Sequence, residues 1–460
     1  MLQRCPPQNI RQVLSELPAS LDETFEHILS EIRTTNVADA YRLLQCLCVA
    51  ARPLRIEELA EIFLLDSDRT EGATPKINED RQWGNPEQAV LSLCSSLIMV
   101  VDTGHSRVVQ FSHFSVKEFL TSNRLATYHS YRLATHHSNP LGTHHPNLVT
   151  TCLPNLRATY RSKDISQFYI ALEAAHTTLT QACLATLLRL DGGLSNDQVE
   201  RNFPLAGYAS QHLVEHAQLG KVPSRIEGGI QRLFDSTKPY FSTWLRLYNI
   251  DDHWNQFGNA WVARGSPLYY ASLCGFRDLA EQIINVHPEQ VNATGGRRRS
   301  PLAAALCKGH FHVAELLLQH GASVDVTDHN NQTLLQAASV EGRINVARWL
   351  LDRGADPNSE QNDHVAPIHL ATANGHPEVI QTLLEHGVDI HSTDKDGRNP
   401  LHLASSSGKV EIVRLLLEHG ANANSVDNDG CTPLSLTWTT EVERLLLDHY
   451  ASPDEGPVLA

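Results

Sequence analysis

A repeat of 33 residues runs through the C-terminal two fifths of this chain and constrains its fold more than any other feature. Related dipeptides recur at this interval: Pro301-Leu302, Leu334-Leu335, Pro367-Ile368, Pro400-Leu401 and Pro433-Leu434, with Pro267-Leu268 placed 34 residues before the first. Glycines follow the same step at Gly309, Gly342, Gly375 and Gly408. Agreement in several registers is typical of a solenoid, in which each unit stacks on its neighbours.

Each unit has the pattern of two helices joined by a tight turn. Val313, Leu316 and Leu317 are spaced i, i+3 and i+4, which gives an apolar stripe that a single two-helix unit cannot bury alone. Gly321 follows the last helical turn, where glycine adopts left-handed backbone without penalty, so we interpret it as structural rather than phosphate-binding. The segment Asp394-Lys395-Asp396-Gly397 predicts an exposed turn between units.

The segments 366–371 (APIHLA) and 399–404 (NPLHLA) resemble the helix-start signature of ankyrin repeats. The resemblance covers about residues 262–453, in six units. Tyr269 replaces the signature His in the first unit, and the last unit lacks three residues between its helices, so both ends resemble capping units. The resemblance implies a non-enzymatic array that binds proteins through its loop tips and the exposed face of its inner helices.

By this resemblance, the partner-binding candidates are the loop tips and the exposed positions of the inner helices. They are Arg297, Arg298, His329, Asn330, Asp363, His364, Lys395 and Asp396 at the tips, and Lys308, Glu341 and Asn374 on the inner helices. We expect about one in three of them to contact a partner, because few exposed solenoid positions do. The run Arg297-Arg298-Arg299 either meets an acidic partner or is a solvated loop.

Helical periodicity also runs through the first 126 residues. Apolar stripes over 21–32, 40–47 and 56–63 predict three helices, and the segment 89–101 predicts a fourth that continues into a strand. Residues 108–111 predict the returning strand of a hairpin that turns near Asp102-Thr103-Gly104. Helices followed by a hairpin indicate a winged helix.

Charge argues against nucleic acid as the partner of this winged helix. Glu57, Glu58 and Glu61 make its third helix acidic, and no basic recognition helix is evident. The whole chain has a net charge of -15, which also disfavours an anionic membrane surface. Nucleic-acid binding is therefore retained only as an alternative to a regulatory role.

Three segments, 17–25, 52–60 and 111–120, are similar to fungal NACHT-ankyrin proteins, which are signal-transducing switch NTPases of the STAND type. The match covers the part after their NTPase core, namely a helical linker and a winged helix of the type also named for GPI inositol-deacylase. In that family, the His of the pattern F-x-H-x-S-x-x-E-F reaches the ADP phosphates and holds the switch closed. His113 occupies this position, and an imidazole can donate to a phosphate oxygen. The alternative is a packed histidine beside Phe111 and Phe114.

The chain departs from this family because it contains no G-x-x-x-x-G-K-[ST] motif to cradle the phosphates. We therefore expect no NTP hydrolysis, no catalytic residue and no cofactor in this chain. It is either a core-less relative that works with a NACHT NTPase module in a partner, or a truncated gene model whose core lies upstream of Met1.

Two histidine patterns in the middle of the chain suggest metals. Residues 128–163 contain His136-His137 and His144-His145 without periodicity, which indicates an exposed insertion or a translated intron with adventitious metal binding. The segment 212–216 (HLVEH) matches the H-x-x-E-H motif of inverted zincins. No third ligand is identifiable, so we expect no metal site and treat a zinc hydrolase as the minor alternative.

These observations predict a mainly α protein in five parts. They are a helical linker (1–35), a winged helix (36–126), an irregular insertion (127–163), a helical connecting region (164–255) and ankyrin repeats (262–453). The nine cysteines form no C-x-x-C pair and no apolar run has the length of a signal peptide or membrane span, so we expect a soluble, cytoplasmic protein. The expected function is a regulatory protein-interaction module, as in fungal non-self recognition receptors.

Overall fold

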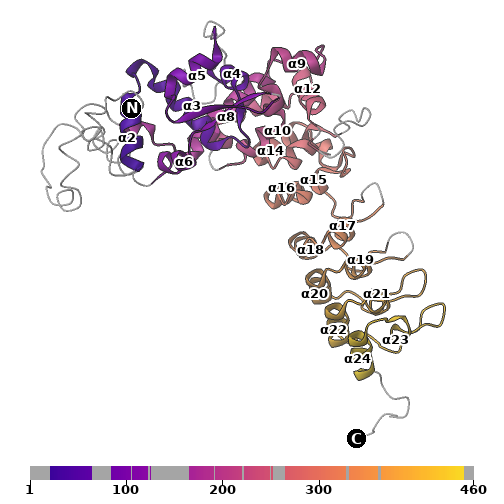
Figure 1. Cartoon of the computed structure of the whole chain (residues 1–460). Helices are drawn as coiled ribbons and strands as arrows, with labels where there is room; N and C mark the ends of the chain where they lie inside the picture. Colours follow the sequence, from indigo (N-terminus) through magenta and orange to yellow (C-terminus); the bar gives the residue numbers. More distant parts are fainter. Residues whose placement is uncertain are drawn as a thin grey trace, which may run out of the picture. The chain divides into compact units, whose positions relative to one another are not determined.

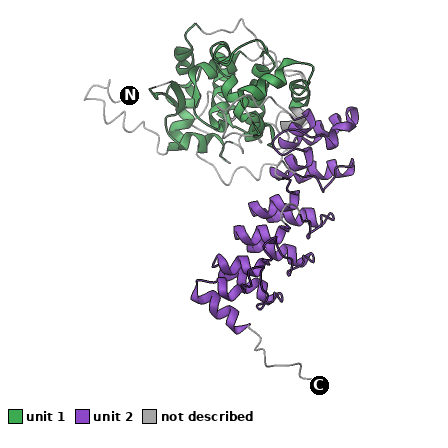
Figure 2. Cartoon of the chain, turned by 90° about the vertical axis from the view of Figure 1, so that its right-hand side faces the viewer, with its two compact units in different colours: residues 1–256 green, residues 257–460 purple. Residues whose placement is uncertain are grey.

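The computed structural model describes a mainly helical chain, as the sequence predicts. It describes residues 21–64, 84–104, 106–122, 125, 165–190, 192–219, 222–248, 250–251, 265–327, 331–360 and 364–449. The chain divides into two compact units, Met1–Gln256 and Phe257–Ala460 (Figure 2). The predicted insertion and its histidine pairs lie outside the described residues. No described helix is long and apolar enough to cross a bilayer.

The first half of unit 1 has helices around a small antiparallel sheet. In chain order the elements are α2 (Leu21–Glu31), η3 (Thr34–Asn36), α3 (Val37–Val49), β1 (Leu54–Arg55), α4 (Ile56–Phe63), α5 (Pro86–Cys94), β2 (Ile98–Asp102), β3 (Arg107–Phe111) and α6 (Ser115–Leu120). The strand order is β1-β3-β2, and the buried Val109 of β3 is opposite both Leu54 and Val100. The predicted helices and hairpin are confirmed. The sequence did not predict β1, because a strand of two residues is too short to show the alternation of buried and exposed side chains.

The second half of unit 1 is a helical bundle that packs against the first half. It contains η5 (Ile165–Phe168), α8 (Leu172–Leu187), α9 (Asn196–Asn202), α10 (Ala206–Ala217), α11 (Val222–Leu233) and α12 (Pro239–Leu247). Helix α8 contacts α3, α10 and α11. Figure 1 labels α3, α8 and α10 in this part of unit 1. Trp244 is fully buried, and its indole N–H donates to Ser210 O at 3.1 Å. The predicted winged helix and connecting region therefore share one compact unit.

Unit 2 is a stack of helix pairs. The pairs are α13 (Pro267–Leu273) with α14 (Arg277–Val286), α15 (Pro301–Cys307) with α16 (Phe311–Gln319), α17 (Leu334–Glu341) with α18 (Ile344–Leu351), α19 (Pro367–Asn374) with α20 (Pro377–Glu385), α21 (Pro400–Ser406) with α22 (Val410–Glu418), and α23 (Pro433–Leu436) with α24 (Thr440–Asp448). A short helix, η6 (Pro288–Asn292), follows α14. Val313, Leu316 and Leu317 are buried, as the stripe predicts.

Local sequence explains where these helices begin and end. The first helix of most pairs starts at a proline, which is preorganised for the first helical position, after a polar residue that accepts a backbone N–H. Ser300, Asn399 and Thr432, for example, accept from the amides of Ala303, His402 and Ser435. Helices α17 and α19 end at glycines with left-handed backbone, Gly342 at φ 69° and Gly375 at φ 83°. Such local signals repeat along the chain, so the period was visible in the sequence.

Candidate functional site

Two of the predicted partner-binding residues pair with each other. The Arg298 guanidinium donates to Glu341 Oε1 at 3.0 Å, and the other Glu341 oxygen lies 2.5 Å from Arg343 Nε. The backbone N–H of Arg298 also donates to the hydroxyl of Tyr269 at 3.1 Å. Tyr269 is buried, so the atypical residue of the first unit supports the next hairpin. Glu341 therefore already neutralises Arg298, which reduces what either charge offers a partner.

The remaining described candidates are exposed and are not gathered into one cluster. Arg297, Lys308, His364, Asn374, Lys395 and Asp396 are exposed, whereas His329, Asn330 and Asp363 lie outside the described residues. The tip that carries Lys395 and Asp396 is bonded to the next hairpin, because Asn428 donates through its side chain to Lys395 O and through its backbone to Asp396 O, both at 3.0 Å. This tip is therefore held by its neighbour.

A column of side-chain donors joins consecutive units at the ends of the inner helices. The carbonyls of Cys307, Val340, Ala373 and Ser406, each 33 residues apart, accept from Arg343, His376, Lys409 and Trp438 respectively. The last carbonyls of a helix lack intrahelical partners, so each such bond satisfies one of them. We did not predict these roles from the sequence. The signal in the sequence was that Arg343, His376 and Lys409 each directly follow one of the repeated glycines. In the last repeat, Trp438 is the donor instead.

His113 is exposed at the start of α6. The Ser115 N–H donates to His113 Nδ1 at 3.3 Å, and the Ser115 hydroxyl lies 2.6 Å from the same nitrogen. Since the amide can only donate, Nδ1 accepts and the neutral ring carries its proton on Nε2. Phe114, beside the ring, is 72% exposed. The His113 ring is therefore exposed, and it contacts the ring of Phe114 at a centroid distance of 4.5 Å.

The H-x-x-E-H segment lies on α10, but its histidines have other roles. Its second histidine, His216, is fully buried, and both of its ring nitrogens are used: Nε2 lies 2.8 Å from the Tyr208 hydroxyl and Nδ1 lies 3.0 Å from His176 Nδ1. His212 instead lies 3.3 Å from the exposed Glu215. No group of three metal-binding side chains occurs in the described part of the chain. The occupied nitrogens of His216 argue against a zinc ligand.

The hydrogen bonds around His216 indicate which of its ring nitrogens carries the proton. The Ala51 N–H donates to the Tyr208 hydroxyl at 3.0 Å, so the Tyr208 O–H is directed to His216 Nε2 and His216 Nδ1–H to His176. Burial, followed by the charges of His176 and His212, lowers the pKa of His216 to about 4. Burial also lowers the pKa of His176. His176 and His216 are therefore held neutral, and with Tyr208 of α10 they link the backbone at Ala51, just after α3, to α8.

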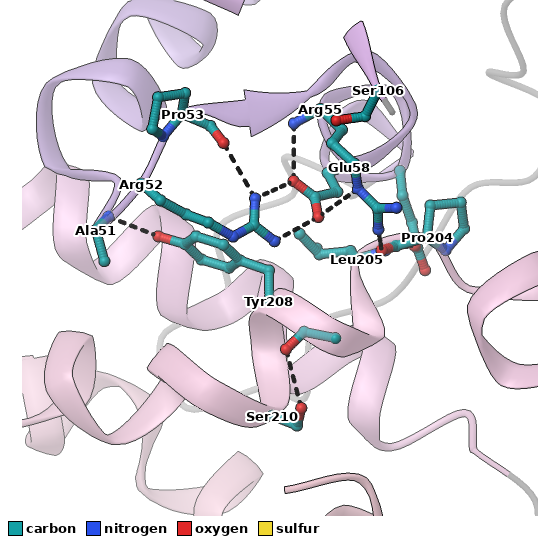
Figure 3. A network of polar contacts seen from close by, with 12 residues as sticks. Ala51, Arg52, Pro53, Arg55, Glu58, Ser106, Pro204, Leu205, Tyr208 and Ser210 are labelled. Atoms are coloured by element: carbon teal, nitrogen blue, oxygen red, sulfur yellow. Dashed lines mark hydrogen bonds and ion pairs between the residues drawn. The ribbon is translucent and has the colours of Figure 1, made fainter. Parts of the chain in front are cut away.

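A buried carboxylate makes a second link between the two halves of unit 1 (Figure 3). Glu58 of α4 accepts two bonds from Arg52, at 2.7 and 2.9 Å, and one from Arg55 Nε at 2.9 Å. Arg55 in turn donates to Pro204 O at 2.9 Å, and Arg52 lies over the ring of Tyr208. Burial alone would raise the pKa of Glu58, but the bonds from Arg52 and the Arg55 amide hold it below its usual value. Glu58 is therefore held in its negatively charged form.

Glu61, one turn further along α4, has mostly neutral partners. It accepts from the Leu205 N–H at 2.8 Å and the Thr186 hydroxyl at 3.1 Å, with Arg189 at 3.5 Å. Burial is the largest effect and raises its pKa. Since Glu58 and Glu61 are both buried, they do not form the acidic surface assumed above, and that reason against nucleic acid is wrong. Helix α5, before the hairpin, still has Glu87 and no Lys or Arg.

Comparison with known proteins places two named domains on this architecture. Ankyrin repeats match residues 268–361 and 368–455, and the GPI inositol-deacylase winged helix domain matches residues 25–131. The chain thus contains ankyrin repeats and a winged helix domain of the GPI inositol-deacylase type. A curated relative, the azaphilone pigments biosynthesis cluster protein L of Monascus ruber, is 31% identical over 326 residues. The alignment covers 66% of this chain and 60% of the relative's length.

Proposed function

We propose that this chain is the regulatory, protein-binding part of a NACHT or STAND-type signalling protein. In this proposal the ankyrin array binds a protein ligand, and unit 1 relays its occupancy to an NTPase module in a longer form of the protein or in a partner. The chain itself is non-catalytic and works in the cytoplasm. A role in fungal non-self recognition rests on the family resemblance, supported by the fungal origin of the relative.

The observation that carries the relay is the exposed His113 imidazole. Its Nδ1 accepts from the Ser115 amide, which leaves the Nε2–H of the neutral ring available for a phosphate oxygen of ADP. Elsewhere in unit 1, Arg55 bonds Pro204, Ala51 bonds Tyr208 of α10, and His216 bonds His176 of α8, so the winged helix is joined to the helical region that follows it.

A full-length transcript read followed by ADP titration tests the proposal. We expect the transcript to encode a P-loop core, and His113→Ala in that longer protein to weaken ADP binding about tenfold, the loss of one hydrogen bond to a charged group. Gln110→Ala, an exposed change on β3, is the control. If no core is present in the transcript, ADP titration of this chain mixed with a NACHT module takes its place. Unchanged ADP affinity in the His113 variant would remove His113 from the mechanism.

The two alternatives receive less support from the geometry. A zinc hydrolase would need the nitrogens of His216, which bond Tyr208 and His176. A nucleic-acid-binding winged helix would present cations on α5, which has none, while Glu87 pairs with Arg107 of the hairpin at 2.7 Å. Protein recognition by the array remains the function that the chain supports best.

A further inference from the structure

The last ankyrin unit presents an aromatic side chain that is both exposed and held in place. Trp438 is 75% exposed, yet its indole N–H donates to Ser406 O at 3.0 Å. Part of its ring lies over Gly408, where an added Cβ would come within 3.2 Å of it. An exposed tryptophan that is already ordered loses little conformational entropy on binding, and tryptophan is enriched among residues that dominate interfaces.

Satisfying the Ser406 carbonyl does not by itself require tryptophan. At the equivalent carbonyls of the preceding units, the donor comes from the non-aromatic Arg343 and Lys409 and from His376, whose smaller ring is half-buried. The indole therefore adds an exposed aromatic surface to a bond that a smaller or cationic side chain makes elsewhere in the array. This surplus of apolar area is the observation that points to a partner.

The charged residues that follow Trp438 in the sequence indicate what it would contact. The first turn of α24 begins two residues later and carries Glu441 and Glu443, both exposed. Over residues 421–449 the exposed acidic residues are Asp429, Glu441, Glu443 and Asp448 and the exposed basic residue is Arg444, whereas Asp427 is buried beside Arg398. A tryptophan face attracts cations, and an acidic surrounding adds to the attraction. The chain already has such a contact, with Arg353 4.2 Å from the ring centroid of Trp349.

We propose that Trp438, with Glu441 and Glu443, receives a lysine or arginine side chain from the protein segment that binds the ankyrin array. The proposal rests on the proposed binding role of the array and specifies its partner: a segment of net positive charge at the C-terminal end of the solenoid. It also names a specificity-determining residue that the family signature does not contain.

The matched variants are Trp438→His and Trp438→Phe in the full chain. Histidine has its Nε2 where tryptophan has its Nε1, counted from Cβ, and His376 shows that this nitrogen can cap such a carbonyl. Trp438→His therefore keeps the donor and loses most of the face, whereas Trp438→Phe keeps a face and loses the donor. We expect the histidine variant to keep its melting temperature at pH 8 and the phenylalanine variant to melt lower.

The probe is a random 12-residue peptide library selected on the unmodified chain, followed by affinity measurement with single synthetic peptides. We expect the peptides to share a lysine or arginine, and its replacement by norleucine to weaken binding about tenfold to the unmodified chain. The same replacement should change binding to the Trp438→His chain less than twofold. Glu441→Gln combined with Glu443→Gln should weaken binding and reduce its salt dependence.

The outcomes separate this proposal from the role of the array. Peptides that depend on Lys308 or Asn374 but bind the Trp438→His chain equally well would overturn the Trp438 site and leave the array's binding role intact. Peptides that need Trp438 but contain no basic residue would overturn the cationic partner. A selection that yields no peptide would overturn the proposed binding role of the array, and this inference with it. Peptide binding that is unaffected by substitution of Lys308, Asn374 or Trp438 would do the same.

Discussion

At the scale of single residues, the environment of each histidine decides its chemistry. His113 and His216 belong to short motifs that both suggest function, but His113 is exposed, whereas His216 is buried with both ring nitrogens bonded. A motif names residue types, whereas protonation and access depend on what surrounds the ring. The H-x-x-E-H match is accordingly a structural element in which His216 joins Tyr208 to His176.

His216 should make unit 1 sensitive to acid. Its pKa is about 4 in the folded chain against an ordinary 6.5, so below pH 6.5 the unfolded chain binds a proton that the folded chain does not. Stability is thus fully present above pH 6.5 and falls by about 2 kcal/mol between pH 7 and pH 5 from this group. At His176, the nearby Glu215 raises the pKa and Lys117 lowers it.

Urea unfolding of unit 1, followed by far-UV circular dichroism at pH 7 and pH 5, measures this effect. His216→Gln should be less stable at pH 7, because it disturbs the bonds to Tyr208 and His176, and should lose most of the difference between the two pH values. His391→Gln, an exposed change in unit 2, is the control. An equal pH dependence in the His216 variant would contradict the assignment.

At the scale of elements, α4 connects the winged helix to the rest of unit 1. Its exposed Glu57 and its buried Glu58 are adjacent in sequence, but only Glu58 bonds Arg52 and Arg55. Arg55 continues to Pro204, 149 residues away along the chain. Helical periodicity could place α4, and the partners of Glu58 are only three and six residues away, but Pro204 and Tyr208, which contact those arginines, come from a distant segment, so the burial of Glu58 was not visible locally.

Glu58→Gln should destabilise the chain by about 3 kcal/mol, because it removes the charge that compensates two partly buried arginines. Glu57→Gln on the same helix should change the free energy of unfolding by less than about 0.5 kcal/mol. Denaturant titrations of both variants provide the comparison. Similar losses in the two would show that the Glu58 network contributes no more than a surface charge.

At the scale of the whole molecule, the chain combines a unit with long-range contacts and a solenoid in which neighbours contact neighbours. In unit 2 the packing runs between consecutive pairs, such as α17 with α19 and α18 with α20. Stability in such arrays is approximately a sum of unit and interface contributions. A substitution that destabilises one ankyrin repeat should therefore also destabilise its neighbouring repeats in unit 2, but it should leave the stability of unit 1 unchanged.

Leu383→Ala tests this separation. Leu383 is fully buried on α20, and its truncation should cost about 2–5 kcal/mol. Hydrogen exchange should then speed up across α18 to α22, while the amides of α8 and α10 keep their rates. Gln381→Ala, an exposed change on the same helix, should leave both regions unchanged. Faster exchange in α8 would show that the two units unfold together.

The sequence by itself determined the repeat, the helix starts, the wing hairpin and the class of fold. These features depend on neighbours within a few residues, such as a proline after a capping side chain or a glycine with left-handed backbone. Local patterns recur in every unit, so they could be recognised without coordinates.

Only the tertiary structure decided which side chains are exposed, paired or buried. The burial of Glu58 and Glu61, the pairing of Arg298 with Glu341 and the fixed indole of Trp438 all depend on segments distant in sequence. Burial and charge pairing are set by the three-dimensional surroundings of a group. For that reason the chemistry of this protein became visible only when distant segments were brought together.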